Sequence, residues 1–160
     1  MMGDLRRYLG EARPAMQRQS ITLEEDARLA ASYLNLQQVR MGDRLRFVID
    51  LPPESRLALV PPMTLTTLVE NAVRHGLSSV SEGGEIRVGA ELDQGSVRIE
   101  VTDTGRGIVP GHGPGLGLAN LRARLEALYG PDANLSLNSK APKGAVASVL
   151  VPAGVTGLPA

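Results

Sequence analysis

The stretch LVENAVRHG, residues 68–76, places an asparagine and a histidine on one face of an expected helix. Asn71 and His75 are four residues apart, so their side chains share that face. We expect Gly76 to end the helix as a C-cap glycine. Taken alone, the stretch fits a core helix with a capped asparagine and a surface histidine equally well, so the surrounding sequence has to decide. The apolar stripe beside the two polar residues consists of Leu65, Leu68, Val69, Ala72 and Val73.

Helical and strand periodicities alternate on both sides of this helix. Thr22 and Glu25 form a capping box that starts a helix running to about Met41. Pro14 is expected to interrupt an earlier helix at residues 4–13, and residues 16–21 are interpreted as a linker. The order of elements, with tight turns between neighbouring strands, predicts an α/β (α+β) fold. It is a two-layer sandwich, in which three helices cover one face of a mixed or largely antiparallel sheet. Strands are expected at residues 44–51, 85–92, 96–102, 134–139 and 145–151, and a further helix at residues 116–129.

The composition fits one globular domain and excludes several classes of function. The 160 residues carry no net formal charge, which gives no support to a nucleic-acid or anionic-membrane surface. Aromatic residues make up only 2%, so stacking platforms for single-stranded nucleic acid are not expected. The chain has no cysteine, which excludes disulfides and thiol chemistry and is compatible with a reducing cytoplasm. No apolar run approaches the roughly 18 residues of a membrane span.

A second stretch, DTGRG at residues 103–107, follows directly on an expected strand and opens a loop rich in glycine. The loop is no P-loop, because the Gly-Lys-Ser/Thr ending is missing, and its spacing does not match a dinucleotide-binding fingerprint. Glycines that lead into a helix can still bind an anion through backbone N–H groups and the helix dipole. A flexible surface loop is the alternative interpretation, and His112 is expected to be a solvent-exposed loop residue. The glycines of this region are Gly105, Gly107, Gly111, Gly113, Gly115 and Gly117.

Three segments at distinctive intervals resemble the N, G1 and G2 boxes of the ATP-binding superfamily shared by DNA gyrase, heat-shock chaperones and histidine kinases (GHKL). They are residues 70–75, 103–107 and 113–118. The flanking segments are similar to those of LytS-like sensor histidine kinases. These flanks are residues 33–45, 60–62 and 120–130. The resemblance covers roughly residues 5–152, and it implies a Bergerat-type ATP-binding fold that binds ATP and Mg²⁺.

The resemblance also implies a role for the polar and glycine residues of the boxes. Asp103 would accept a hydrogen bond from the exocyclic amine of adenine, since a carboxylate is acceptor-only; a strand-end aspartate that caps the next turn is the alternative. Asn71 would offer an amide oxygen to Mg²⁺, which typically keeps water and phosphate oxygens as its other ligands. Gly105 and Gly107 would let the backbone approach the purine. The residues implied for the lid hinge and the phosphate contacts are Gly113, Gly115, Leu116, Gly117 and Leu118.

Two residues implied to be catalytic each have a second interpretation. His75 either lies near the phosphates or is a helix-end histidine bound by a carbonyl. Glu70 either serves as a base or pairs with Arg74, four residues further along the helix. The residues alone leave both alternatives open.

The sequence departs from the family pattern at two positions. Pro114 stands where the family more often has a small hydroxyl residue, so one side-chain donor and one backbone N–H to a phosphate are missing. Nucleotide affinity is expected to be lower for that reason. Thr67 stands four residues before Asn71, where hydrolysing members carry a glutamate that activates water. Because a threonine is no general base near neutral pH, phosphoryl transfer is favoured over hydrolysis.

These features predict the ATP-binding catalytic domain of a two-component sensor histidine kinase, which transfers the ATP γ-phosphoryl to a histidine outside this chain. The acceptor is expected elsewhere, because both histidines, His75 and His112, fall in the nucleotide site. The alternatives are a nucleotide-responsive interaction module with little catalysis and an anti-sigma-type serine kinase. The expected partners are ATP, the phosphoacceptor histidine of the full-length kinase and a response regulator, without nucleic acid and without membrane contact by these residues.

The resemblance further implies how the chain is divided. We expect the end of a dimerisation-helix region, a linker and a leading helix in residues 1–42, the catalytic domain in residues 43–152, and a flexible tail in residues 153–160. The full-length protein is expected to be membrane-anchored, with this domain on the cytoplasmic side.

Overall fold

The computed structural model describes residues 2–78, 80–108 and 115–152. The expected tail at residues 153–160 lies outside them, as do Gly111, His112, Gly113 and Pro114. None of the described helices combines the length and the apolar character that crossing a membrane requires.

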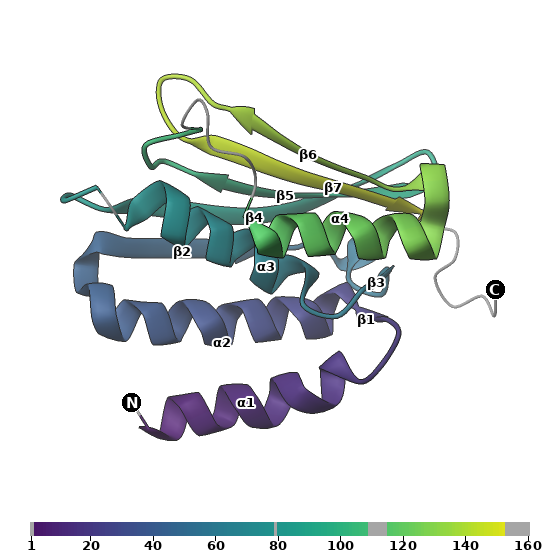
Figure 1. Ribbon diagram of the computed structural model, residues 1–160, viewed down its shortest axis with the longest axis horizontal. Helices are drawn as coiled ribbons and strands as arrows, with labels where there is room; N and C mark the ends of the chain where they lie inside the picture. Colours follow the sequence, from purple (N-terminus) through teal and green to yellow (C-terminus); the bar gives the residue numbers. More distant parts are fainter. Residues whose placement is uncertain (1, 79, 109–114, 153–160) are drawn as a thin grey trace.

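A five-stranded mixed sheet forms one layer of the molecule (Figure 1). Its strands follow the spatial order β2-β4-β5-β7-β6; β2 pairs with β4 in parallel, and the other neighbours are antiparallel. The predicted hairpin is confirmed, and its turn residues Gln94 and Gly95 both have positive φ, as a tight two-residue turn between twisted strands requires. The strands are β2 (Leu45–Asp50), β4 (Gly84–Asp93), β5 (Ser96–Asp103), β6 (Asn134–Ser139) and β7 (Ala145–Pro152).

Helices cover one face of this sheet, as predicted. Figure 1 shows α3 and α4 next to the sheet, α2 beside them, and α1 outside α2, farther from the strands. The predicted capping box is present, because Thr22 Oγ1 accepts a hydrogen bond from the Glu25 N–H at 3.1 Å. The helices are α1 (Met2–Met16), α2 (Leu23–Met41), α3 (Thr64–Asn71) and α4 (Leu116–Tyr129).

The amino-terminal region differs from the prediction in two details. Pro14 does not interrupt the first helix: it lies inside α1, two residues before the end at Met16, where few further helical bonds remain to be lost. The expected linker runs into a short strand, β1 (Ile21–Thr22), which pairs with β3 (Leu59–Val60). A strand of two residues carries no periodicity, so the sequence could not reveal it.

One apolar core joins the helices to the sheet, and it is built from Leu, Val, Ile and Ala, as the low aromatic content requires. It includes Leu34 and Leu68 from the helices and Ile86 and Ile99 from the strands, all without solvent exposure. Ala12 of α1 belongs to the same core. The described residues before and after position 42 therefore share one core, and the division of the chain at that position stays a prediction.

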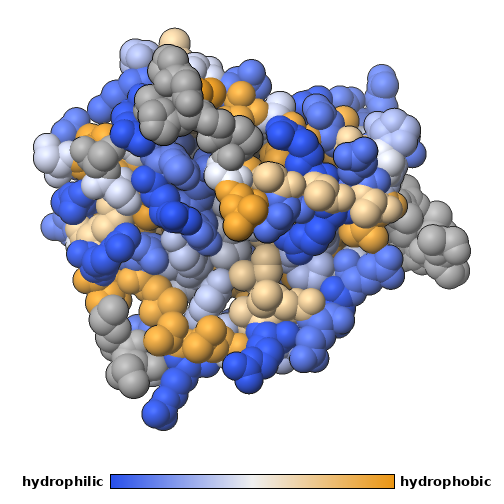
Figure 2. Space-filling model, in the orientation of Figure 1, coloured by the Kyte–Doolittle hydropathy of each residue, from blue (hydrophilic) through white to orange (hydrophobic). Residues whose placement is uncertain are grey.

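The outer side of α1 is partly apolar. Leu5, Leu9 and Met16 expose 42%, 48% and 62% of their surface, respectively. Figure 2 shows that hydrophobic residues gather at the lower edge of the molecule, where α1 begins, among hydrophilic residues over most of this view. On the inner side, the rings of Tyr8 and Tyr33 lie 6.4 Å apart between α1 and α2.

Candidate functional site

The helix that carries Asn71 changes its winding where the candidate site begins. After Asn71 the backbone becomes π-helical from Ala72 to Leu77. The wider turn is closed by Ser78, whose N–H and hydroxyl both donate to the carbonyl of Val73 at 2.8 Å. Single π-helical turns are rare and frequently occur at functional sites. The prediction that Gly76 is a helix C-cap is wrong, because Gly76 is buried inside this turn.

Gly76 is a glycine because the carboxylate of Asp103 packs against its Cα. A methyl group on Gly76 would lie 2.8 Å from Asp103 Oδ1 and 2.9 Å from the carboxyl carbon. Gly105 is equally confined, since a methyl group there would overlap the carbonyl of Gly76. The first two boxes are thus in direct backbone contact, although about thirty residues separate them in the sequence.

Asp103 ends β5 and is almost fully buried, with 4% of its surface exposed. Its Oδ1 accepts a hydrogen bond from the Gly105 N–H at 2.8 Å, which is the turn-capping contact that the sequence allows as an alternative. Burial raises the pKa of Asp103, against the opposing effect of the Gly105 and Ala145 N–H groups and the charge of Lys140. A carboxylate has about four acceptor positions, so the turn bond leaves capacity for a ligand donor.

The loop after Asp103 is held in place by its neighbours. Thr104 Oγ1 accepts from the Glu85 N–H at 3.0 Å, and the Thr104 N–H donates to the Glu85 carbonyl at 3.2 Å. Gly107 has a φ of 81°, a conformation that favours glycine. Gly144, which lies between β6 and β7, packs against the carbonyl of Asp103 so closely that a methyl group would overlap it.

Thr67, Asn71 and His75 form the face of α3 and the π turn that meets the start of α4. A methyl group on Gly117 would lie 3.5 Å from Thr67 Cγ2, and one on Gly115 would lie 3.6 Å from His75 Nε2. Asn71 is four residues from both Thr67 and His75, so it lies on the same face, and it is half-buried. The structure therefore brings Thr67 and His75 to the amino-terminal end of α4, and Asn71 lies between them at helical spacing.

The first turn of α4 offers backbone donors. Its N-cap, Gly115, makes no side-chain capping bond within the described residues, and the first intrahelical bond runs from Ala119 N to Gly115 O at 3.1 Å. The N–H groups of Leu116, Gly117 and Leu118 have no partner in the preceding turn, as at any helix start. Leu118 is 3% exposed and belongs to the apolar core.

Glu70 points away from this face. Its Oε1 pairs with Arg74 Nη1 at 3.1 Å, which is the ion pair that the four-residue spacing allows. After burial, the Glu70 charge is the next largest cause of the raised pKa values of Tyr8 and Tyr33, with Tyr33 raised to about 12. Glu70 therefore lies on the side of α3 that faces α1 and α2, and the geometry favours the ion pair over a base.

A family model described as the histidine kinase-, DNA gyrase B- and HSP90-like ATPase matches residues 62–155, which span the three boxes. The chain belongs to this ATPase family. The resemblance to the GHKL superfamily is thereby confirmed.

Individual relatives extend the similarity beyond the ATPase domain. The sensor histidine kinase YesM of Bacillus subtilis is 31% identical over 142 residues, which cover 86% of this chain and 25% of YesM. The sensor protein LytS of Staphylococcus saprophyticus is 35% identical over 133 residues, or 75% of this chain and 22% of LytS. The chain thus spans about a quarter of the length of these relatives.

A solved structure supports the fold of this ATPase domain. The histidine kinase domain of a blue-light activated histidine kinase from Erythrobacter litoralis EL346 superposes with a TM-score of 0.68 at 19% identity. The superposition covers 94% of this chain and 73% of that domain. At this identity the likeness concerns the fold, which agrees with the predicted sandwich.

Two residues that connect elements of the candidate site were not predicted from the sequence. Asp26 of α2 is fully buried, and its two carboxylate oxygens accept from the N–H groups of Met63 and Leu65 at 2.9 and 2.7 Å, at the start of α3. Arg106 connects the loop after Asp103 to the π turn. Asp26 could have been noticed in the sequence, because it is a charged residue on the apolar face of an expected helix. For Arg106, the only signal was its position inside the DTGRG stretch.

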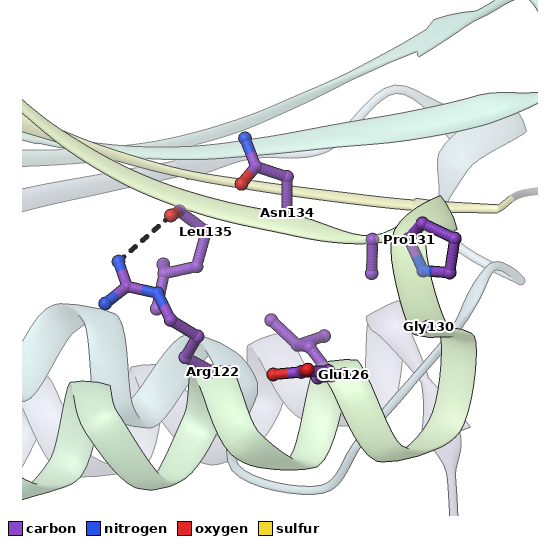
Figure 3. A pocket seen from close by; sticks show the side chains of 8 residues that line it. Arg122, Glu126, Gly130, Pro131, Asn134 and Leu135 are labelled. Carbon is purple, nitrogen blue, oxygen red and sulfur yellow. Dashed lines mark hydrogen bonds between the residues drawn. The ribbon is translucent and has the colours of Figure 1, made fainter.

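A separate groove of about 410 Å³ lies between α4 and β6 (Figure 3). Arg122 reaches across it and donates from Nη2 to the Leu135 carbonyl at 3.1 Å, while Glu126 lies on the α4 side. The residues that line this groove include none of the predicted site residues, so the groove is separate from the candidate nucleotide site. The lining residues are Arg122, Leu125, Glu126, Gly130, Pro131, Ala133, Asn134 and Leu135.

Proposed function

We propose that these residues form the ATP-binding catalytic domain of a sensor histidine kinase, which passes the γ-phosphoryl of Mg·ATP to a histidine outside this chain. The observation that carries the proposal is the junction of Asp103, Gly76 and Gly105. It holds a buried carboxylate at the end of a strand, next to the face that carries Asn71 and His75. The name of the relative YesM, a sensor histidine kinase, supports the same activity.

Asp103 is proposed to bind adenine. An acceptor-only carboxylate selects a donor edge such as the exocyclic amine, and its burial strengthens the hydrogen bond because little water competes. Gly105 and Gly107 are proposed to let the loop backbone lie close to the purine.

Asn71 is proposed to hold Mg²⁺ through its amide oxygen, and the metal would neutralise phosphate charge during transfer. A single amide oxygen from the protein fits Mg²⁺, because this metal takes its other ligands from phosphate and water. Among the described residues, no group of three or more His, Asp, Glu or Cys side chains could bind a metal by itself. The N–H groups at the start of α4 are suited to phosphate oxygens, for which the helix dipole adds attraction. His75 is proposed to lie beside the phosphates.

Catalysis would then rest on positioning and charge neutralisation. Thr67 lies on the face toward α4, at the position where a hydrolysing enzyme would carry a glutamate as general base. A threonine at this position cannot activate water. The phosphoryl group is therefore expected to pass to a histidine, and from there to a response regulator as the downstream partner.

Binding is tested by calorimetry with a non-hydrolysable ATP analogue and Mg²⁺. We expect saturable binding that Asp103→Asn weakens strongly, because the amide presents a donor in place of one acceptor. Asp93→Asn, at the exposed end of β4, is the matched control and should bind like the wild type. Absence of binding at millimolar nucleotide would refute the proposal.

Phosphotransfer is tested with labelled ATP and a protein that combines this domain with a phosphoacceptor histidine. Label that is labile in acid and stable in base indicates phosphohistidine and supports the kinase. Binding without transfer would support the second candidate, a nucleotide-responsive interaction module, which the residue type at Thr67 and Pro114 also allows.

A further inference from the structure

Arg106 lies within the DTGRG stretch, and none of the proposed contacts to nucleotide or metal uses its side chain. It is exposed, and it makes two bonds to the end of the helix that carries Asn71 and His75. Its Nε donates to the carbonyl of His75 at 2.9 Å, and its backbone N–H donates to the carbonyl of Gly76 at 3.0 Å.

These two carbonyls belong to the last turn of the π helix, where a helix has no intrahelical donors left. The neighbouring carbonyl of Leu77 accepts from the Val80 N–H at 3.0 Å. Arg106 therefore completes the cap of this helix end from another element, and its positive charge faces the negative end of the helix dipole.

The bond between Arg106 and His75 connects two parts of the candidate site, the loop after Asp103 and the π turn. The bond to the His75 carbonyl holds the backbone from which the His75 ring extends toward Gly115. On the other side, Gly105 precedes Arg106 and binds Asp103. One residue thus links the loop at the adenine side to the turn at the phosphate side.

We propose that Arg106 is a positioning residue that sets the distance between Asp103 and the Asn71–His75 face. The inference rests on the proposed nucleotide site and adds one function to it. Losing the Arg106 side chain leaves Asp103 and its turn bond in place, but removes one of the two bonds from Arg106 to the π turn. The affinity for a nucleotide with phosphates and Mg²⁺ should therefore fall, while the affinity for the nucleoside should stay unchanged.

The experiment compares Arg106→Met, which keeps length without a donor, with Arg106→Lys and wild type. Calorimetry measures the dissociation constants of adenosine and of a non-hydrolysable ATP analogue with Mg²⁺. Arg106→Met should bind the analogue about fivefold more weakly, which is the order of effect of a cation at a helix carboxyl end, and should bind adenosine as wild type does. Arg106→Lys should recover part of the affinity, because lysine keeps the charge but not the planar N–H geometry.

Arg56→Met is the matched control. Arg56 is also exposed and its Nε also donates to a backbone carbonyl, that of Leu51, at 3.0 Å. It lies beyond the end of β2 at Asp50, away from the loop after Asp103. Arg56→Met should leave both dissociation constants unchanged.

Equal losses for adenosine and the analogue would show general loosening and overturn the proposal, and so would no loss for either. Hydrogen exchange of the ligand-free protein gives a second measurement. The Ser78 amide, which closes the π turn, should exchange faster in Arg106→Met than in Arg56→Met. If wild type binds no nucleotide, the proposed function fails, and exchange alone decides whether Arg106 holds the turn.

Discussion

At the residue scale, the candidate site depends on backbone contacts that a single methyl group would prevent. Gly76 leaves room for the Asp103 carboxylate, and Gly105 leaves room for the Gly76 carbonyl. Neither has a positive φ, so their conformations would accept other residues. Space is what confines these two positions to glycine.

Gly76→Ala should therefore lower the stability and the nucleotide affinity together. Its methyl group has to displace a buried carboxylate, and overpacking of this kind typically costs roughly 1–3 kcal/mol of unfolding free energy. Urea denaturation measures that cost, and calorimetry measures the affinity. Gly10→Ala is the control: Gly10 is exposed in the middle of α1 with open space at its Cα, so alanine should stabilise the protein by about 0.5–1 kcal/mol. A neutral Gly76→Ala would contradict the close approach.

Thr67 gives a second prediction at this scale. Replacing it by glutamate places a carboxylate on the face that meets Gly117, where it can accept a proton from water. We expect Thr67→Glu to raise ATP hydrolysis by at least about tenfold, since general bases commonly contribute more than that. Phosphate release is the measurement, and Thr67→Gln, of the same shape but without a basic group, should stay at the wild-type rate. Equal rates for Glu and Gln would show that this face does not reach the phosphates.

At the scale of elements, α3 and its π turn are held at both ends by side chains from elsewhere in the chain. Asp26 of α2 binds the N–H groups at its start, and Arg106 binds the carbonyls at its end. Arg124 of α4 adds a bond to the Pro62 carbonyl at 2.8 Å, just before α3 begins. The helix that carries Asn71 and His75 is thus fixed by tertiary contacts more than by its own eight residues.

The cap at Asp26 makes stability depend on pH. Burial raises the pKa of Asp26 to about 7, although the N–H bonds of Leu65 and Met63 and the charge of Arg124 act in the opposite direction. In an unfolded chain an aspartate titrates near 4. Between these pH values the folded protein keeps a proton that the unfolded chain has lost, so this group's contribution to the unfolding free energy should fall as the pH rises from about 4 to 7. An NMR titration of the Asp26 carboxyl checks this, and a midpoint near 4 would contradict it.

Removing the cap should also be costly. Asp26→Ala leaves the buried N–H of Leu65 and the partly buried N–H of Met63 without acceptors, which we expect to lower the unfolding free energy by about 2–4 kcal/mol. Glu24→Ala, an exposed acid in the same first turn of α2, should change it by less than about 0.5 kcal/mol.

The elements that the sequence predicts well are those whose signals are local. The strand alternation at residues 96–102, the Thr22 cap and the helix from Leu116 depend on neighbours within a few residues, and the structure has all three. The π turn, the role of Gly76 and the cap at Asp26 depend on contacts across 27 to 39 residues, which a single sequence does not display. The approximate site was predictable from motifs, whereas the contacts that hold its parts together were not.

At the scale of the whole molecule, α1 and α2 belong to the same core as the sheet. Tyr8 and Tyr33 fill the space between these two helices, and the charge of Glu70, next to Asn71, reaches both hydroxyls. We therefore expect α1 to unfold together with the rest in one transition. Far-ultraviolet circular dichroism and tyrosine fluorescence should give the same midpoint; an earlier fluorescence change would show that α1 separates first.

Because the molecule has one core, nucleotide binding at the junction of α3, α4 and the sheet should stabilise all of it. A ligand at a hundredfold its dissociation constant adds about 2.7 kcal/mol. For a domain of about this size that corresponds to a rise in Tm of roughly 5–10 °C. Thermal unfolding with the ATP analogue, with and without Mg²⁺, measures the rise. In Asn71→Ala, the part that depends on Mg²⁺ should disappear while the part due to adenine stays, because Asp103 is untouched. If Mg²⁺ still adds its full increment to Asn71→Ala, the metal is held elsewhere, and the helix that contains Asn71 then serves the site only by supporting Gly76 and His75.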